Sequence, residues 1–174
     1  MNPSTDFVLR DCEERDVAQI TAIYGHAVLN GFGTFEIEPP NEPEMRARRN
    51  AIVTKGFPYL VAEWEGRVVG YAYAGAYHPR AGYRLTLEDT IYIDAAFQGR
   101  GVGYRLLGRV LERAAAAGFR QMVAVIGDSR NEGSIRVHAK HGFVHVGTLR
   151  GVGLKKDRWL DVVIMQRALG VEDR

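Results

Sequence analysis

Two spacings of hydrophobic residues divide the chain into helices and strands. Apolar side chains that recur every three or four positions cover one face of a helix, and apolar side chains that alternate cover one face of a strand. The segments predicted to be helices are 16–29, 42–55, 104–117 and 131–141. The segments predicted to be strands are 7–12, 59–64, 67–76, 85–94, 121–126, 143–149 and 159–167.

The order of these segments predicts the fold class. A hairpin joins 59–64 to 67–76 through Glu65-Gly66, and a strand–helix–strand unit follows over 85–126. The segment 121–126 is continuously apolar, which is typical of a strand buried on both faces. The pattern therefore predicts an α/β (α+β) domain, with a run of antiparallel strands before the strand–helix–strand unit.

The composition is that of an ordinary globular protein. The 174 residues are 46% hydrophobic and 25% charged, which fits one domain with a sizeable core. We expect this domain to cover 7–169, between a flexible N-terminal segment, 1–6, and a C-terminal tail, 170–174.

Charge and cysteine content exclude several classes of function. The net charge is +2, and no block of like charges indicates a nucleic-acid partner. The sequence shows neither a secretory leader nor an apolar run of about 18 residues, which a membrane-spanning helix would need. The single cysteine, Cys12, excludes an internal disulfide and a Cys-based zinc site. We therefore expect a cytoplasmic protein without nucleic-acid or membrane partners.

A glycine-rich turn is the sharpest local feature. The sequence Gln98-Gly99-Arg100-Gly101-Val102-Gly103 lies between a predicted strand and a predicted helix. Backbone N–H groups and the helix dipole at such a turn attract anions, and glycines let the backbone approach phosphate oxygens closely. The turn is therefore a candidate phosphate site.

The glycine spacing does not match two other phosphate-binding turns. A Rossmann turn requires glycines at i, i+2 and i+5, but Tyr104 or Leu106 stands at the third position. A Walker A loop requires Gly-Lys-Ser/Thr, whereas the chain has Gly103-Tyr104-Arg105. From the turn alone, a structural turn without a ligand stays open.

Two motifs together resemble the GNAT N-acetyltransferase superfamily. The spacing Gln98-x-x-Gly101-x-Gly103 is similar to the acetyl-CoA loop of that superfamily, Gln/Arg-x-x-Gly-x-Gly/Ala. A second element, Asn131-x-x-Ser134-Ile135-x-Val137-His138-x-x-x-Gly142-Phe143, follows at the expected distance, with His138 where many members have tyrosine. The resemblance implies a GNAT fold, which is a mixed, mostly antiparallel twisted sheet of about seven strands with helices on both faces, splayed where the cofactor enters.

Further strings resemble one branch, the phosphinothricin and methionine sulfoximine N-acetyltransferases. They begin at Thr34, Val69, Thr86, Val123 and Lys155, and read TFE, VGYAYAG, TLEDTIYI, VAVIG and KxxRWLDxxxM. The resemblance covers about residues 7 to 168. It implies transfer of acetyl from acetyl-CoA to the α-amine of a small amino-acid analogue, and a homodimer.

The resemblance also implies roles by position. Glu88 matches a general base and His138 matches a histidine of proton transfer. The implied acetyl-CoA-binding residues are Ile91, Tyr92, Ile93, Gly99, Arg100, Gly101, Val102, Gly103, Tyr104, Asn131 and Ser134. The implied acceptor-binding residues are Phe35, Glu36, His78, Arg80, Tyr83, Glu88, Asp89 and Thr90. Among these, His78 stands where relatives carry Lys or Arg, and Arg80 is not universal, so the identity of the acceptor stays open.

The chemistry of these side chains suits direct acyl transfer. An α-amine is mostly protonated at pH 7, so a proton acceptor such as a partly buried Glu88 is needed. A backbone N–H of Tyr92 or Ile93 can hold the oxyanion that forms when the amine attacks the thioester. His138 can supply a proton to the leaving thiolate.

Each candidate also has a structural interpretation. Glu88 can be a solvated strand residue, and His138 can pack against the core. His78 and Arg80 can be ordinary loop charges, and Arg48 can belong to a solvated helix face. His138 and His141 share a helix face, but no third ligand accompanies them, so we expect no metal.

Two alternative functions stay open from the sequence. The same fold could acetylate another amine, such as a polyamine or a protein N-terminus. A non-catalytic acyl-CoA sensor would bind the cofactor without turnover, but it would have no need of proton-transfer groups such as Glu88 and His138.

Overall fold

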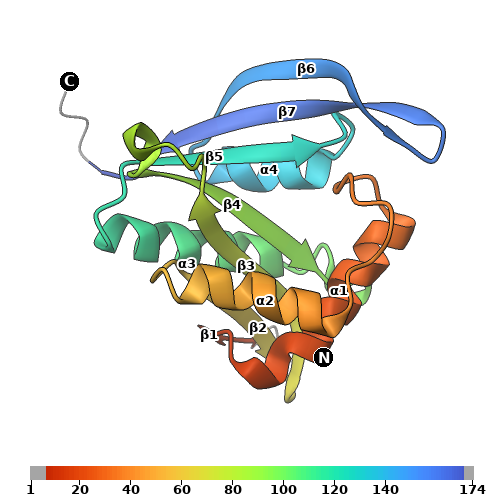
Figure 1. Ribbon diagram of the computed structural model, residues 1–174, viewed down its shortest axis with the longest axis vertical. Coiled ribbons are helices and arrows are strands. Elements are labelled where there is room, and N and C mark those ends of the chain that lie inside the picture. Colours follow the sequence, from red (N-terminus) through yellow and green to blue (C-terminus); the bar gives the residue numbers. More distant parts are fainter. Residues whose placement is uncertain (1–6, 171–174) are drawn as a thin grey trace.

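A seven-stranded sheet with helices on both faces forms the centre of the computed structural model, which describes residues 7–170 (Figure 1). The helices are α1 (Val17–Asn30), α2 (Glu42–Val53), α3 (Val102–Ala116) and α4 (Glu132–Lys140). The strands are β1 (Val8–Asp11), β2 (Tyr59–Trp64), β3 (Arg67–Ala76), β4 (Thr86–Ile93), β5 (Gln121–Gly127), β6 (Val144–Lys155) and β7 (Arg158–Ala168). Short 3-10 helices are η1 (Glu14–Asp16), η2 (Ala81–Tyr83) and η3 (Ala95–Phe97). The predicted segment 1–6 and, apart from Gly170, the predicted tail lie outside the described residues.

The sheet is antiparallel except at its centre. Its strand order is β1-β2-β3-β4-β5-β7-β6, and only the β4–β5 pair is parallel. The β4–β5 pairing runs only from Thr86–Gln121 to Glu88–Val123, although both strands continue. The two strands therefore separate beyond Glu88, which confirms the predicted splay.

The helices cover the two faces unequally. α1 and α2 pack on one face of the β2–β3–β4 region, and α3 packs on the opposite face of the same strands (Figure 1). α4 contacts α3 and β5. The opening between β4 and β5 thus lies between two helical layers.

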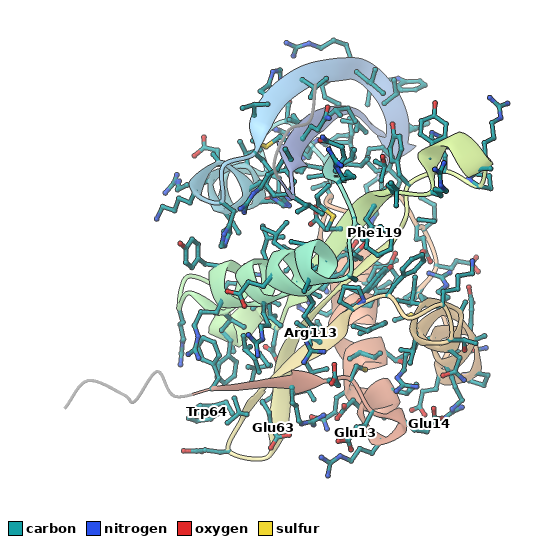
Figure 2. The ribbon with its side chains drawn as sticks, turned by 90° about the vertical axis from the view of Figure 1, so that its left-hand side faces the viewer. Glu13, Glu14, Glu63, Trp64, Arg113 and Phe119 are labelled. Atoms are coloured by element: carbon teal, nitrogen blue, oxygen red, sulfur yellow. The ribbon has the colours of Figure 1, made fainter. Side chains whose placement is uncertain are left out.

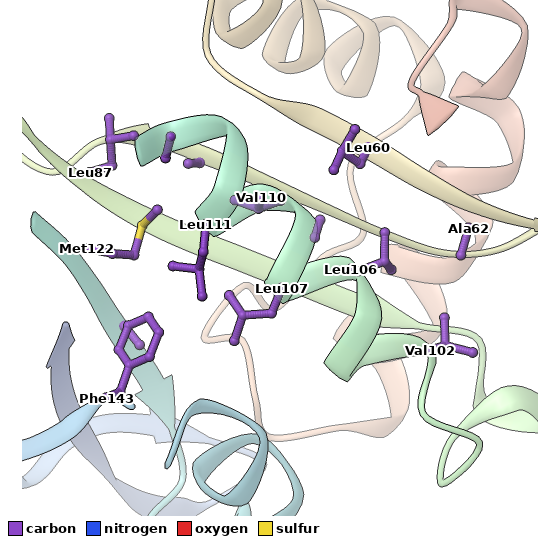
Figure 3. Packing of buried hydrophobic residues seen from close by; sticks show 14 of the residues in the cluster. Leu60, Ala62, Leu87, Val102, Leu106, Leu107, Val110, Leu111, Met122 and Phe143 are labelled. Atoms are coloured by element: carbon purple, nitrogen blue, oxygen red, sulfur yellow. The ribbon is translucent and has the colours of Figure 1, made fainter. Parts of the chain in front are cut away.

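The main core lies under α3. Leu106, Leu107, Val110 and Leu111 cover one face of this helix and are buried against the sheet (Figure 3). The residues that they meet include Leu60, Leu87, Met122 and Phe143. Full burial of such a side chain contributes about 1.5–3 kcal/mol, so the α3 face fixes the glycine turn that precedes it.

An ion pair at β1 and an aromatic contact at the end of β2 join these strands to the other side of the domain; Figure 2 labels one partner of each, Arg113 and Trp64. Arg113 of α3 forms an ion pair with Asp11 at the end of β1. The Trp64 ring, at the end of β2, packs against Phe97 of η3 with ring centres 5.2 Å apart. The contact places η3, which leads into the glycine turn, on the first hairpin.

The structure corrects two of the predicted strands. β6 continues to Lys155, whereas the alternation predicted an end at residue 149. A register shift between Leu149 and Gly153, with Gly151 at a φ of +57°, interrupts the alternation without ending the strand. Val125 of β5 was expected to be buried, but it is 42% exposed because β4 has already separated from β5 there.

No helix among residues 7–170 is long and apolar enough to cross a bilayer.

Candidate functional site

A groove of about 1380 Å³ opens where β4 and β5 separate. Its walls come from β4, β5, the glycine turn, α4, α1 and the loop after α1. The predicted cofactor-binding residues that line it are Ile91, Tyr92, Ile93, Gly99, Gly101, Val102, Gly103, Tyr104, Asn131 and Ser134. The exception is Arg100, whose guanidinium lies over the Phe97 ring, 4.9 Å from its centre.

The glycine turn has the conformation of an anion site. Gly99 and Gly101 have φ of +74° and +81°, values that favour glycine. Gly101 is the N-cap of α3 and supplies no side-chain cap, so the first turn of the helix keeps its N–H groups for another acceptor. With the helix dipole behind it, the turn fits the diphosphate that the family resemblance implies.

Backbone groups of β4 face the opening in a fixed alternation. Tyr77 N bonds Thr86 O at 3.3 Å and Asp94 N bonds Val69 O at 3.0 Å, so the even-numbered residues of β4 direct their N–H groups to β3. The N–H groups of Ile91 and Ile93 therefore point to the side from which β5 has withdrawn. Of the two predicted oxyanion donors, Ile93 meets the geometry, whereas the N–H of Tyr92 is directed to β3.

Glu88 lies where the two strands begin to separate. It is half-buried, lines the groove and lies on the α1–α2 side of β4, opposite Leu87. Burial, followed by the neighbouring charge of Asp89, raises the pKa of Glu88 above its ordinary value. A carboxylate with a raised pKa at the edge of a groove suits a general base.

Asp89 and His138 form a buried pair at the groove wall. His138 Nε2 donates to Asp89 Oδ2 at 2.9 Å, and Nδ1 donates to the Ser134 carbonyl at 2.7 Å. An ionised carboxylate and a carbonyl both accept, so this pair of contacts favours the doubly protonated imidazolium form of His138. Burial opposes this charge, but the hydrogen bond and charge of Asp89 outweigh it and raise the pKa of His138. Because neither N–H is free, a proton can leave His138 only if one bond opens.

A second, smaller cavity of about 170 Å³ lies between the sheet and α1–α2. Its lining is rich in tyrosine and consists of Tyr24, Glu36, Met45, Arg48, Tyr59, Tyr71, Tyr73, Thr90 and Tyr92. Thr90 and Tyr92 line the groove as well, so the cavity and the groove meet at β4. Two of the lining residues, Glu36 and Thr90, are predicted acceptor contacts.

Glu36 enters the cavity through a hydrogen-bonded network. Tyr24 donates to Glu36 Oε1 at 2.7 Å, and Arg48 donates to both carboxylate oxygens at 2.6 and 3.2 Å. Burial opposes ionisation of Glu36, but these bonds outweigh it and lower the pKa of its carboxyl group. Arg48 is exposed and pairs with Glu44 one turn away on α2, as expected for a solvated helix face, and it also lines the cavity and pairs with Glu36.

Four predicted acceptor contacts lie elsewhere, and one of them, Phe35 in the loop between α1 and α2, lines neither the groove nor the small cavity. His78, Arg80 and Tyr83 belong to the β3–β4 connection and line neither the groove nor the small cavity. The rings of His78 and Tyr83 pack on each other, with centres 5.1 Å apart. Their place in acceptor binding stays a prediction.

Asn131 and the histidines of α4 have structural partners. Asn131 Oδ1 accepts from Ser134 N at 3.3 Å and caps α4. His141 Nε2 donates to the Tyr104 carbonyl at 2.8 Å, and its ring stacks on Tyr104. Among residues 7–170, no three His, Cys, Asp or Glu side chains gather in a way that could hold a metal ion.

Comparisons with known proteins place this architecture in a family. The model of the acetyltransferase (GNAT) family matches residues 21–143. A phosphinothricin N-acetyltransferase of Alcaligenes faecalis is 47% identical over 165 residues, covering 95% of this chain and 84% of that protein. The L-methionine sulfoximine/L-methionine sulfone acetyltransferase of Salmonella typhimurium is 38% identical over 161 residues, covering 92% and 94%.

A solved structure shows the same arrangement. The phosphinothricin acetyltransferase of Sinorhizobium meliloti in complex with acetyl-CoA has a TM-score of 0.93 and 44% identity, and the match covers 96% of this chain and 90% of that one. The chain belongs to the GNAT acetyltransferase family. The enzyme is therefore an acetyl-CoA-dependent acyltransferase that transfers acetyl to an amine, and the predicted family and fold are confirmed.

Cys12 lines neither the groove nor the small cavity. Its thiol is buried, and burial raises its pKa to about 11, so it stays protonated at neutral pH.

Sequence reasoning missed most of the small cavity. Tyr71 and Tyr73 alternate on β3 opposite Tyr92 and Thr90 of β4, so a shared aromatic face was visible in the spacing. Tyr24 reaches the same face from α1, and this contact is set by helix packing that no local pattern encodes.

Proposed function

We propose that the enzyme acetylates the α-amine of a small amino-acid analogue, of the phosphinothricin, methionine sulfoximine or methionine sulfone type, by direct attack on acetyl-CoA. The observation that carries the proposal is the junction of groove and cavity at Thr90 and Tyr92, close to Glu88 along β4. A cavity of about 170 Å³ suits a small molecule better than a peptide. The named substrates of the relatives point to the same class of acceptor.

Three parts of the chain divide the chemistry in this proposal. Glu88 accepts the proton of the α-amine, directly or through a water, so that the neutral nitrogen can attack. The N–H of Ile93 stabilises negative charge on the acetyl oxygen. When the thiolate leaves, the nitrogen loses its second proton and the thiolate takes up a proton to become the CoA thiol, while the charge of the His138 imidazolium stabilises the thiolate. The glycine turn with Asn131 and Ser134 holds the cofactor.

The β3–β4 connection would contribute to recognition of the acceptor. We assign His78, Arg80 and Tyr83 to the acidic or sulfonyl end of the acceptor, at the entrance to the site. If Arg80 has this role, Arg80→Ala lowers kcat/KM for methionine sulfoximine by about tenfold, as expected for loss of one charge-assisted hydrogen bond. An unchanged specificity constant would remove Arg80 from the acceptor site.

Steady-state kinetics test the proposed function. Release of free CoA thiol is measured with phosphinothricin, methionine sulfoximine, methionine sulfone, a polyamine and a peptide with a free N-terminus. The proposal expects turnover of at least one amino-acid analogue with the highest kcat/KM of the panel. Preference for the polyamine or the peptide would contradict the acceptor class, and binding without turnover of any amine would indicate a sensor.

Glu88→Gln tests the base in the same assay. We expect kcat/KM for the amine to fall by about 10²–10⁴-fold at neutral pH, because general-base catalysis is lost while the shape is kept. Calorimetry should show unchanged binding of acetyl-CoA. In the unmodified enzyme, kcat/KM should fall on the acid side at a pH above the ordinary range of a glutamate, since burial raises the pKa of Glu88.

The outer strand supports a homodimer. β6 pairs only with β7 among the described strands and exposes a row of aliphatic residues. The exposed residues of this row are Val144, Val146, Leu149, Val152 and Leu154. A long apolar edge strand is a site of association in soluble proteins, and two-fold dimers are the commonest assembly. We infer that a second copy covers β6.

Cellular location and domain limits follow from the same proposal. We place the enzyme in the cytoplasm, where its single buried thiol stays reduced. We assign the activity to one domain, 7–169.

A further inference from the structure

The loop between α1 and α2 carries Phe35 and Glu36 and is held by a distant hairpin. Lys155, at the end of β6, is 2% exposed, and its Nζ donates to the Thr34 carbonyl at 2.8 Å. The two residues are 121 positions apart in the sequence. A buried ammonium group directed at one carbonyl of a loop is a strong anchor, because a charged donor strengthens the hydrogen bond.

Gly153, on the same face of β6 as Lys155, makes room for the Phe35 ring of the loop. A Cβ atom at this position would overlap the Phe35 ring, and its distance to Cζ would be 2.8 Å. Gly147, on the same strand, has open space where its Cβ would lie. Gly153 therefore leaves the volume that the Phe35 side chain occupies.

The remaining ring of the loop is also held by this hairpin. The Arg158 guanidinium, at the start of β7, lies over the Phe32 ring, 4.2 Å from its centre. Lys156 donates to the Leu29 carbonyl at the end of α1. The hairpin thus contacts the loop from its first residues to Phe35.

Hydrogen bonds connect Thr34 to two residues that line the small cavity. Thr34 Oγ1 is 2.9 Å from the Tyr24 hydroxyl, which donates to Glu36 Oε1 at 2.7 Å. The backbone N–H of Glu36 bonds Thr34 Oγ1 at 3.3 Å. Tyr24 and Glu36 line the small cavity, whereas Lys155 and Gly153 line neither the cavity nor the groove.

We propose that Lys155 and Gly153 are positioning residues, which fix the loop that carries Phe35 and Glu36 and thereby set which acceptor side chains the small cavity accepts. The inference rests on the proposed function, because it takes this cavity as the acceptor site. The outer face of β6, which includes Val152 and Leu154, is the surface assigned to the dimer, so the strand joins that surface to the acceptor loop.

Two variants and two matched controls test the proposal. Lys155→Met keeps the length of the side chain and removes its donor, and Lys55→Met makes the same change at an exposed position. Gly153→Ala adds a Cβ against Phe35, and Gly147→Ala adds one in open space. KM and kcat are measured for methionine sulfone and phosphinothricin, and the Kd of acetyl-CoA is measured by calorimetry.

The proposal expects the two variants to change acceptor binding and not cofactor binding. Lys155→Met and Gly153→Ala should raise the acceptor KM by about tenfold, or change the preference between the acceptors by that factor, with little change in the Kd of acetyl-CoA. Both control variants should behave as the unmodified enzyme. Amide hydrogen exchange of the acetyl-CoA-loaded enzyme should become faster at 32–36 in Lys155→Met.

Three results would overturn the proposal. Unchanged acceptor KM and preference in an active Lys155→Met enzyme would overturn the positioning role alone, including when the melting temperature falls. Unchanged exchange at 32–36 would show that Lys155 does not hold the loop. An unmodified enzyme that acetylates no amino acid would overturn the proposed function, and this inference with it. If Gly153→Ala does not fold, Lys155→Met alone tests the positioning role, because it introduces no steric clash with the loop.

Discussion

Glu88 and Asp89 are neighbours in the sequence, but the pleat of β4 sends them to opposite faces of the sheet. Glu88 faces the α1–α2 side and has no ion-pair partner among the described residues, whereas Asp89 is buried and holds His138 on the other side. Asp89 Oδ1 is buried without a hydrogen-bond partner in the described part of the chain. Under the proposed function, the two adjacent carboxyl groups would have separate tasks: Glu88 would accept a proton, and Asp89 would keep His138 in place.

The pKa values of the two histidines in the α4 region should be shifted in opposite directions. Asp89 raises the pKa of His138 against the effect of burial, whereas burial lowers the pKa of His141. In one ¹⁵N NMR titration, His138 is expected to lose its proton above about pH 6.5, the ordinary value, and His141 below it. Asp89→Asn should lower the pKa of His138 and have little effect on the pKa of His141.

The same shift affects stability with a definite sign. A raised pKa stabilises the folded state fully below about pH 6.5 and ceases to do so as the pH rises through the folded pKa of His138. Urea unfolding should therefore show a larger loss of stability in Asp89→Asn at pH 6 than at pH 9. An equal loss at both values would mean that His138 is neutral in the folded protein.

The glycine turn shows how an element creates a site without side chains. Gly101 combines a positive φ with the N-cap position of α3, and Gly118 has a similar φ of +86° at the other end of that helix. Alanine costs roughly 1–2 kcal/mol in this conformation at either position. The two glycines therefore form a matched pair for separating strain from binding.

Only the turn at Gly101 should affect the cofactor. Gly101→Ala is expected to weaken acetyl-CoA binding by about tenfold, because displaced N–H groups lose hydrogen bonds to an anion. Gly118→Ala should lose comparable stability in thermal unfolding and keep the Kd. Calorimetry and a thermal melt of each variant check this, and equal Kd values for both would remove the turn from the binding site.

Local patterns predicted most elements because each has a regular period. The hairpin of β2 and β3 and the face of α3 follow directly from alternation and helical spacing. β6 was predicted too short because glycines and a register shift break its alternation. Glu88, His138 and the glycine turn were singled out by motifs. The contacts of Arg48 with Glu36 and of Lys155 with Thr34 were not predicted, because these partners come from distant elements.

At the scale of the whole molecule, the two edges of the sheet differ. β1 is short and has four residues, whereas β6 has twelve and exposes aliphatic side chains along its length. Short edge strands discourage association and long apolar ones favour it. The β6 edge is therefore the surface on which a second copy is expected.

A charge on the β6 edge should separate the dimer. Val152→Glu places a carboxylate in the inferred interface, and an uncompensated buried charge costs about 3–5 kcal/mol. Dimer affinity should then fall by roughly 100-fold or more, which sedimentation equilibrium measures. Val8→Glu places the same charge at an exposed position on β1. This control variant should keep the dimer affinity of the unmodified enzyme. A dimer that survives Val152→Glu would place the interface elsewhere.

The separation of β4 from β5 leaves an interrupted ladder in the middle of the sheet rather than at its rim. Any extended molecule with amide groups that enters there can take the place of the missing neighbour and complete the hydrogen bonding of Ile91 and Ile93. Such a guest adds to the free energy of unfolding in proportion to the logarithm of its concentration. The melting temperature of this protein would then rise with the concentration of its own co-substrate.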